Sequence, residues 1–267
     1  MKSAVWRDAR VYLKYIRMHF LSGLEYKGWW MMALQVLLVC VADFLPSFLI
    51  FARMGDIGAW TWERILLIYA LAVASFGLAE SFCRGFDYFP WHMLRSGNFD
   101  RLLLRPRSLA VQVAGSFFHI HRLARAAIGI FAAVWALSRL GVPATAFSVG
   151  VIGLALLGGT LVYSGVFVLC SGIAFFTIKA LDWIYILTNA SYQVTRIPID
   201  YMPGLFRRAF TFLMPMLVIS YYPAAVVCGW GEPVAAGFLA LPAGAAFLGL
   251  SLLVWKLGVR HYQSTGS

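Results

Sequence analysis

Charged residues are scarce in this sequence: only 12% of its 267 residues are charged, and only 11 are acidic. A soluble domain is about one quarter charged. With 61% hydrophobic residues, the sequence is not that of an ordinary soluble protein. It predicts an all-α, polytopic membrane protein. The cysteines are scattered and lack the spacing of a disulfide framework or a zinc site; they are Cys40, Cys83, Cys170 and Cys228.

Motifs for nucleotide, metal or hydrolytic chemistry are missing as well. None of the five lysines follows a glycine, so the sequence has no GxxxxGK[ST] loop for nucleotide phosphates. HExxH, CxxC and GxSxG are also absent. The histidines are expected at membrane interfaces rather than around a metal; they are His19, His92, His119, His121 and His261. We therefore predict that the chain is not an enzyme and binds no metal or cofactor itself.

The net charge of +11 does not indicate nucleic-acid binding. The Lys and Arg residues lie between apolar runs, where membrane topology requires them. With both termini inside, nineteen of the 22 Lys and Arg residues fall on the inner side, and Arg53, Arg64 and Arg139 fall outside. This asymmetry predicts cytoplasmic termini in a cytoplasmic membrane.

Six apolar stretches are long enough to cross a bilayer, which takes about 20 residues each. We expect the spans at Trp29–Phe51, Trp60–Phe82, Ala126–Val142, within Phe147–Ile178, at Ala209–Val227 and at Val234–Leu257. Residues 1–267 then form one membrane domain. In the fourth span, Gly158, Gly165 and Gly172 recur at seven-residue steps, which predicts that another helix approaches closely.

The stretch 86–106 is the most highly charged interruption between spans. It combines arginines and aspartates with an aromatic and apolar face, a combination that suits the water–lipid boundary or a groove on another protein. We predict that it docks a separate subunit, and that Asn98 caps a short helix at 99–105 that Pro106 ends. The residues assigned to this coupling are Phe86, Trp91, Arg95, Asn98, Asp100, Arg101 and Arg105.

Two further segments are predicted to lie on the cytoplasmic surface. Residues 4–22 have an apolar stripe opposite a basic stripe, which is typical of a helix lying flat on an anionic leaflet. This helix either anchors the topology or helps to dock a partner. Residues 179–208 are mixed in character, and Pro198 and Pro203 argue against one continuous helix there.

Two acidic residues lie in or near the apolar spans. Asp43 is deep in the first span, where an acid is a functional candidate. It either acts in transport or has a structural role, in which it pairs with backbone groups near the break at Pro46 or lies in a polar outer vestibule. Glu80 precedes Arg84 by one helical turn, which favours a structural ion pair over substrate contact.

The candidates for lining a translocation path are Asp43 of the first span and four residues of the fifth, Pro215, Tyr221, Tyr222 and Pro223. Pro215 and Pro223 each remove a backbone donor, so they either shape a path or fix a kink. The aromatic residues Tyr221 and Tyr222, with Phe210 and Phe212, either line a path for an amphiphilic substrate or pack as ordinary core.

Three segments, in order, resemble the motifs of one family. LRSGNFDRLLLRP resembles the G-x-hydrophobic-D-x-LLLRP signature of the ABC-2-type permeases of bacterial export ABC transporters. RIPIDYMPGLFRRAFTFLMPMLVISYYPA and KLGVRHYQSTGS resemble the family's later motifs. The chain departs from the family pattern at Ile197 and Met202, where tyrosine often precedes the two prolines.

The resemblance implies a permease subunit of the bacterial inner membrane that dimerises, with itself or with a related chain. It also implies that a paired ATP-binding subunit supplies the energy. Residues 4–22 would be its interfacial helix and residues 86–106 its coupling helix. Two other hypotheses stay open: a proton-coupled secondary transporter that uses Asp43, and a membrane scaffold that transports nothing.

Overall fold

A computed structural model describes residues 2–25, 28–177 and 191–263 of the chain. These residues fold into helices and connecting loops without a β-sheet; Ile57 and Trp60 form one isolated bridge. The main helices are α1 (Lys2–Glu25), α2 (Trp29–Met54), α3 (Trp62–Phe89), α6 (Leu123–Arg139), α7 (Ala146–Ala174) and α12 (Ala240–His261). The all-α prediction is confirmed for the described residues.

The helices contain five candidate membrane spans, or six if one bent pair counts as a span. The five are Trp30–Met54, Trp62–Leu94, Ile120–Arg139, Ala146–Ala174 and Ala240–His261. The bent pair joins Gly204–Leu213 to Met216–Cys228 at an angle of 69°. The chain is therefore a multi-pass membrane protein, and its spans correspond to the predicted apolar stretches except where the bent pair replaces a straight fifth span.

The bend follows from Pro215. A residue before proline is forced toward extended backbone, and Met214 has φ −125° and ψ 95°. The helix of residues 209–213 therefore ends, and α10 (Met216–Ile219) starts in a new direction, followed by α11 (Tyr221–Cys228). Pro223 lies in the first turn of α11, where a missing N–H is tolerated.

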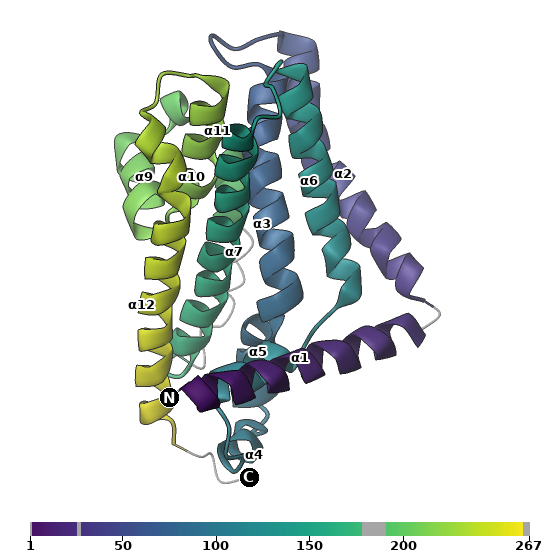
Figure 1. Ribbon diagram of the computed structural model, residues 1–267, viewed down its shortest axis with the longest axis vertical. Coiled ribbons are helices and arrows are strands. Elements are labelled where there is room, and N and C mark those ends of the chain that lie inside the picture. Colours follow the sequence, from purple (N-terminus) through teal and green to yellow (C-terminus); the bar gives the residue numbers. More distant parts are fainter. Residues whose placement is uncertain (1, 26–27, 178–190, 264–267) are drawn as a thin grey trace.

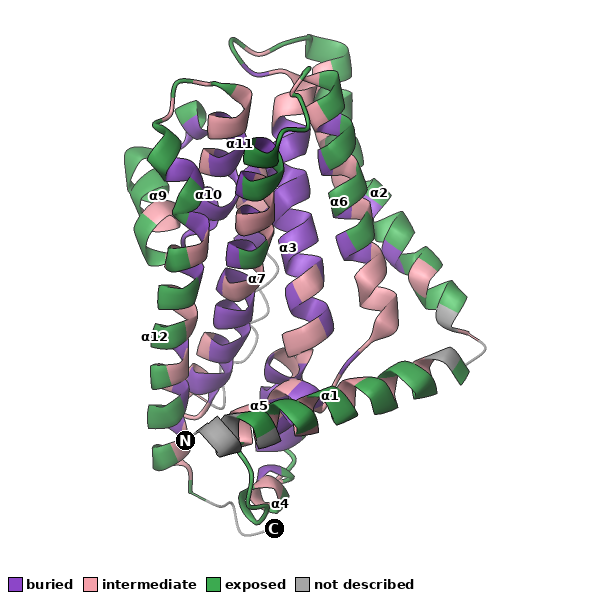
Figure 2. Ribbon diagram, in the orientation of Figure 1, coloured by how far each residue is buried: buried purple, intermediate pink, exposed green. Residues whose placement is uncertain are grey.

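Helix α3 stands at the centre of the bundle and is buried along most of its length (Figures 1 and 2). It packs between α6 and α7, and α7 packs in turn against α12. The glycine stripe of α7 faces α12: a Cβ added at Gly158 would meet the backbone of Ala240, and one at Gly172 would meet that of Trp255. The predicted close approach is present, and the neighbouring helix is α12.

The bundle has two ends, which we name by the helices that lie there. At the α4 end, α1 lies across the bundle beside α5 (Leu109–Gly115), with α4 (Phe99–Leu103) projecting beyond them (Figure 1). The α2–α3, α6–α7 and α11–α12 connections lie at the opposite, α11 end. The Tyr12 hydroxyl donates to the Phe82 carbonyl at 2.7 Å and so ties α1 to α3.

Several helix boundaries differ from the sequence predictions, and two of them bear on the site. Helix α3 continues past Phe82 to Phe89, and a π-helical turn extends it to Leu94, because Phe86, Phe89 and Leu94 are buried against the core. The short helix after Asn98 ends at Leu103 rather than at residue 105.

The predicted cytoplasmic segment 179–208 lies partly outside the described residues. Its described part, 191–208, does not lie with α4 as expected. The Trp60 indole N–H donates to Asp200 Oδ2 at 2.9 Å, which places Asp200 beside the α2–α3 connection. Helix α9 (Gly204–Arg208) lies beside α10, away from α4 (Figure 1). The basic composition of segment 179–208 had predicted that it lies on the same side of the membrane as residues 86–106.

Candidate functional site

The end of α4 and the two residues after it form an exposed tip that is both basic and apolar. Leu104 has 86% of its surface exposed. Arg101, Leu103 and Arg105 are exposed beside it. An isolated exposed leucine needs no explanation, but two leucines flanked by two arginines form a surface suited to an apolar and acidic partner. We call Arg101, Leu103, Leu104 and Arg105 the coupling tip.

An aromatic cluster fixes the tip to the bundle. Phe99 is fully buried, and its ring centroid lies 5.2 Å from Phe89 and 4.9 Å from Tyr262. Phe89 also packs edge-on against Trp255 of α12 at 4.7 Å. The cluster therefore joins α3, α4 and the end of α12.

Asp100 and Phe86 help to fix the coupling tip to the bundle and do not form part of its exposed surface. Burial, and then the nearby Asp100 carboxylate, raise the pKa of Tyr262 above its usual value. Phe86 is buried, packs edge-on against Trp255 at 5.0 Å, and its carbonyl accepts a hydrogen bond from Ser171.

The other predicted coupling residues lie on exposed parts of the same segment. The Arg95 guanidinium lies over the Trp91 ring at 5.7 Å. The Asn98 side chain does not cap α4, because it donates to the His92 carbonyl at 3.3 Å and to Ser96 Oγ at 2.8 Å. These contacts hold the turn between α3 and α4 in one conformation.

Helix α1 also reaches the coupling tip. The Arg105 guanidinium donates to the Tyr15 hydroxyl at 3.3 Å. The ring of Tyr15 packs over Gly115 of α5, where an added Cβ would lie 3.0 Å from the tyrosine Cβ. The two segments that the sequence singled out for docking, 4–22 and 86–106, are therefore in contact.

Glu80 is the centre of a buried ion cluster. Its side chain is 2% exposed, and it pairs with Arg84, with Arg122 at 3.2 Å and with Arg125 at 3.5 Å. Arg84 also pairs with Asp87 at 3.2 Å. The predicted Glu80–Arg84 pair is present, but it is one part of a cluster that ties α3 to α6. Buried charges persist only when they are paired in this way.

Aromatic rings link this cluster to a second ion pair around Asp43. Arg125 lies over the ring of Tyr192 at 5.9 Å, and Tyr192 stacks on Tyr69 at 6.2 Å. The Tyr69 hydroxyl accepts from Arg196, whose guanidinium lies 3.1 Å from Asp43 Oδ1. Asp43 therefore has a cationic partner, and their ion pair is partly exposed.

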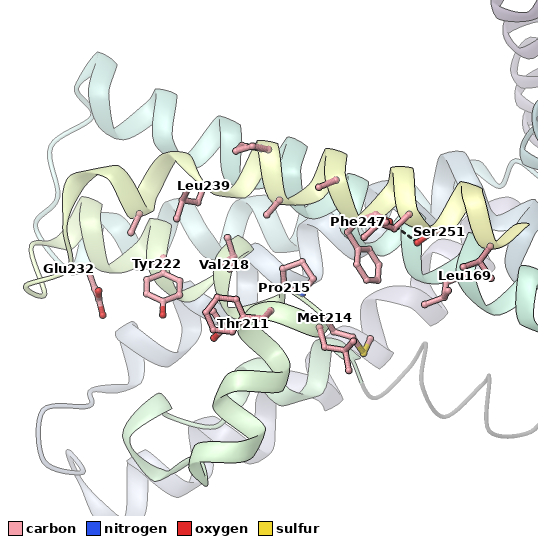
Figure 3. A pocket seen from close by; sticks show the side chains of 18 of the residues that line it. Leu169, Thr211, Met214, Pro215, Val218, Tyr222, Glu232, Leu239, Phe247 and Ser251 are labelled. Atoms are coloured by element: carbon pink, nitrogen blue, oxygen red, sulfur yellow. Dashed lines mark hydrogen bonds between the residues drawn. The ribbon is translucent and has the colours of Figure 1, made fainter.

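A large apolar cavity lies between the bent pair and α12. Its volume is about 960 Å³, and apolar side chains form most of its wall. Figure 3 shows Glu232 and Tyr222 toward one end of it, and Leu169 and Ser251 toward the other. Pro215 and Tyr222 line this cavity, as do Phe212 and Thr211.

The other predicted path residues lie elsewhere. Tyr221 donates to Glu232 at 3.3 Å and packs near the Trp60 ring at 6.3 Å. Pro223 is buried inside α11, and Asp43 pairs with Arg196. The five candidates do not converge on one surface.

Sequence reasoning missed the cationic partners and the most exposed tip residue. Arg122, Arg125 and Arg196 were counted as topology signals, since an arginine next to an apolar span looks the same whether it meets lipid headgroups or a buried acid. Leu104 stands in a run of three leucines, and only the fold separates it from the half-buried Leu102. Within the described residues, no three His, Cys, Asp or Glu side chains come together to hold a metal.

The comparisons with known proteins agree with this architecture. A family model described as ABC-2 family transporter protein matches residues 37–266, which is most of the chain. Neither a curated protein nor a solved structure is significantly similar to the chain.

Proposed function

This chain belongs to the ABC-2 family of transporter proteins, and we propose that it is the membrane subunit of an ATP-driven exporter in the bacterial inner membrane. A separate ATP-binding subunit binds and hydrolyses ATP, since this chain carries no phosphate-binding loop. The observation that carries the proposal is the coupling tip, an exposed apolar and basic surface anchored to two spans.

The α4 end faces the cytoplasm in this proposal, so both termini are cytoplasmic. The exposed basic residues of α1, Arg10, Lys14 and Arg17, lie at this end with the coupling tip. Arg207 and Arg208 lie in α9, away from that end. This weakens the predicted charge asymmetry without reversing it, and the positive-inside rule still favours this orientation.

ATP binding moves the spans through the tip. Closure of the ATP-binding subunits pushes on residues 101–105, and the buried Phe99 passes the displacement to α3 and α12. The Arg105–Tyr15 contact moves α1 with them. In this scheme residues 86–106 are the coupling segment and α1 is the interfacial helix, within a single membrane domain.

A second permease chain completes the translocation path. Helix α2 contributes little to the core, and large apolar side chains are exposed along it; among them are Leu38, Val41, Leu45 and Leu49. A second copy or a related chain packs beside this helix. The apolar cavity lined by Pro215 and Tyr222 receives the apolar part of the exported molecule.

Removing the coupling tip is expected to uncouple the chain from its partner. The double variant Arg101→Ala, Leu104→Ala should fold normally, because both side chains are exposed, yet co-purify at least about tenfold less ATP-binding subunit, as loss of an interface hot spot does. The matched control is Leu205→Ala, an equally exposed leucine in α9 at a distance from the tip. Stoichiometric co-purification and full transport by the double variant would contradict the proposal.

Asp43 is expected to act through its ion pair with Arg196 and not as a proton site. Asp43→Asn should lower stability by about 1.5–3 kcal/mol, as loss of a charge-assisted hydrogen bond does. The double variant Asp43→Asn, Arg196→Gln should recover part of the lost stability, since the arginine is then no longer left as an unpaired charge. ATP-dependent transport in vesicles should persist in the double variant. Transport driven by a proton gradient and lost in Asp43→Asn would favour a secondary transporter instead.

A further inference from the structure

Two neighbouring cavities open between α1, the start of α2 and the loop that leads into α6. One has a volume of about 300 Å³ and the other about 70 Å³, and both are lined by Met32 and His121. Their polar lining comes from three segments and consists of His19, Ser22, Gln35, His119, His121, Arg122 and Arg125. As far as the chain is described, no acidic side chain lines either cavity.

The electrostatic potential in these cavities is positive. The ion cluster behind them holds three arginines against Glu80 and Asp87, so one positive charge is left over. Burial, and then electrostatic repulsion from the side chains of His121, Arg122, Arg84 and His19, lower the pKa of His119 to about 4. The excess of arginine charge over the two acids favours an anion in the cavities.

Two buried nitrogens at the cavity walls have hydrogen-bonding capacity to spare. His119 Nδ1 has no hydrogen-bond partner among the described residues, and Arg125 Nε is likewise unsatisfied. Arg125 Nε forms an ion pair with Glu80 Oε2, but their separation of 3.5 Å is beyond a good hydrogen bond. Buried polar atoms without partners are uncommon and call for a ligand or an ordered water.

The cavities lie at the depth of lipid headgroups. They sit where two candidate spans begin, at Trp30 and at Ile120. Helix α1, with its exposed basic residues, borders the larger one. Val36 and Val39 of α2 line the smaller one, and Val39 is also exposed toward the lipid. A phosphate in the cavities could therefore continue into an acyl chain along α2.

We propose that these cavities bind the phosphate headgroup of an anionic phospholipid. His19, Ser22, His119 and His121 contact the phosphate, Arg122 and Arg125 supply the positive field, and the acyl chains lie along α2. Basic pockets between transmembrane helices bind anionic lipids in this way. The bound lipid braces α1 against α2 and α6, and α1 also contacts Arg105 of the coupling tip. Lipid binding itself does not rest on the proposed transport function.

The test measures which lipid the full chain retains and which lipid stabilises it. The detergent-purified protein is mixed with phosphatidylglycerol, phosphatidylcholine or inorganic phosphate, and native mass spectrometry and the thermal midpoint are recorded. We expect phosphatidylglycerol to remain bound and to raise the midpoint, whereas phosphatidylcholine and inorganic phosphate do neither. Equal effects of the two lipids, or stabilisation by inorganic phosphate alone, would overturn the assignment.

Variants locate the binding to these cavities. His19→Asn with His121→Asn should weaken phosphatidylglycerol binding by about tenfold, as the loss of about 1.4 kcal/mol does. His261→Asn, at the exposed end of α12, is the control and should bind like wild type. Gln35→Ala, an exposed position that will not disturb folding, should weaken binding less. Unchanged lipid retention in the double variant and in Gln35→Ala would show that the lipid binds elsewhere.

Discussion

Replacing Glu80 with Gln is expected to lower the stability of the folded protein by about 3–5 kcal/mol, which is typical when one partner of a buried ion pair is removed. Glu80 is 2% exposed and neutralises Arg84, Arg122 and Arg125 together. Glutamine keeps the shape and one acceptor oxygen, but it leaves the three guanidinium groups against a single remaining acid, Asp87. The measurement is the thermal midpoint and the yield of monodisperse protein in detergent.

Two further variants separate the effect of charge from that of shape. Glu25→Gln removes an exposed acid at the end of α1 and should leave the midpoint unchanged. Glu80→Gln combined with Arg122→Gln removes one acid and one base, so the double variant should recover part of the loss, with a coupling energy of about 0.5–3 kcal/mol. A midpoint for Glu80→Gln equal to that of Glu25→Gln would mean that the cluster does not hold α3 to α6.

The Glu80 cluster separates contacts that sequence spacing can predict from contacts that it cannot. Arg84 follows Glu80 by one helical turn, so the spacing was enough to predict their pair. Arg122 lies 42 residues further on in the chain. No spacing rule brings it to Glu80, because the contact depends on how α3 packs against α6. The ion pair of Asp43 with Arg196 has the same cause, and it left Asp43 without an identified partner in the sequence.

The membrane spans were more predictable, because a bilayer demands long apolar helices. Five predicted spans coincide with straight candidate helices to within a few residues at most ends. The bend at Pro215 could be suspected from the proline, but its angle and the position of residues 191–208 depend on tertiary contacts such as that of Asp200 with Trp60. Charge counting placed that segment with α4, because it scores a basic residue without regard to its partner.

The second large expected effect on stability concerns the close contact between α7 and α12, which we call the seam. Gly158→Ala is expected to destabilise the protein markedly, because the added Cβ would overlap the carbonyl of Ala240 and the nearby backbone of Leu241. These are backbone atoms, so no side-chain rotation relieves the clash and the helices must separate. Overpacking costs about 1–3 kcal/mol and sometimes more, whereas the gain in helix propensity from Gly to Ala is at most about 1 kcal/mol. The cost of the clash therefore exceeds the gain in helix propensity, and the net effect of Gly158→Ala is to destabilise the protein.

Gly153→Ala is the matched control, since it makes the same substitution in the same helix. A Cβ at Gly153 meets nothing within 4 Å, so only the propensity gain remains and the thermal midpoint should stay level or rise. The pair is measured by thermal unfolding in detergent, followed by Gly158→Leu, which we expect to give no folded protein. Equal midpoints for Gly158→Ala and Gly153→Ala would mean that α7 and α12 do not approach as closely as the structure has them.

The same seam connects stability to coupling. Gly172 lies against Trp255, and Gly258 lies against Phe175, so the close contact of α7 with α12 continues to the aromatic cluster under the coupling tip. Spreading the helices at Gly158 should loosen the packing of Phe99 on Trp255 and weaken transmission from the tip. Any Gly158→Ala protein that folds should therefore bind the ATP-binding subunit normally, through its intact tip, while its transport per ATP hydrolysed falls. Normal transport by that variant would place the path of coupling in α3 alone.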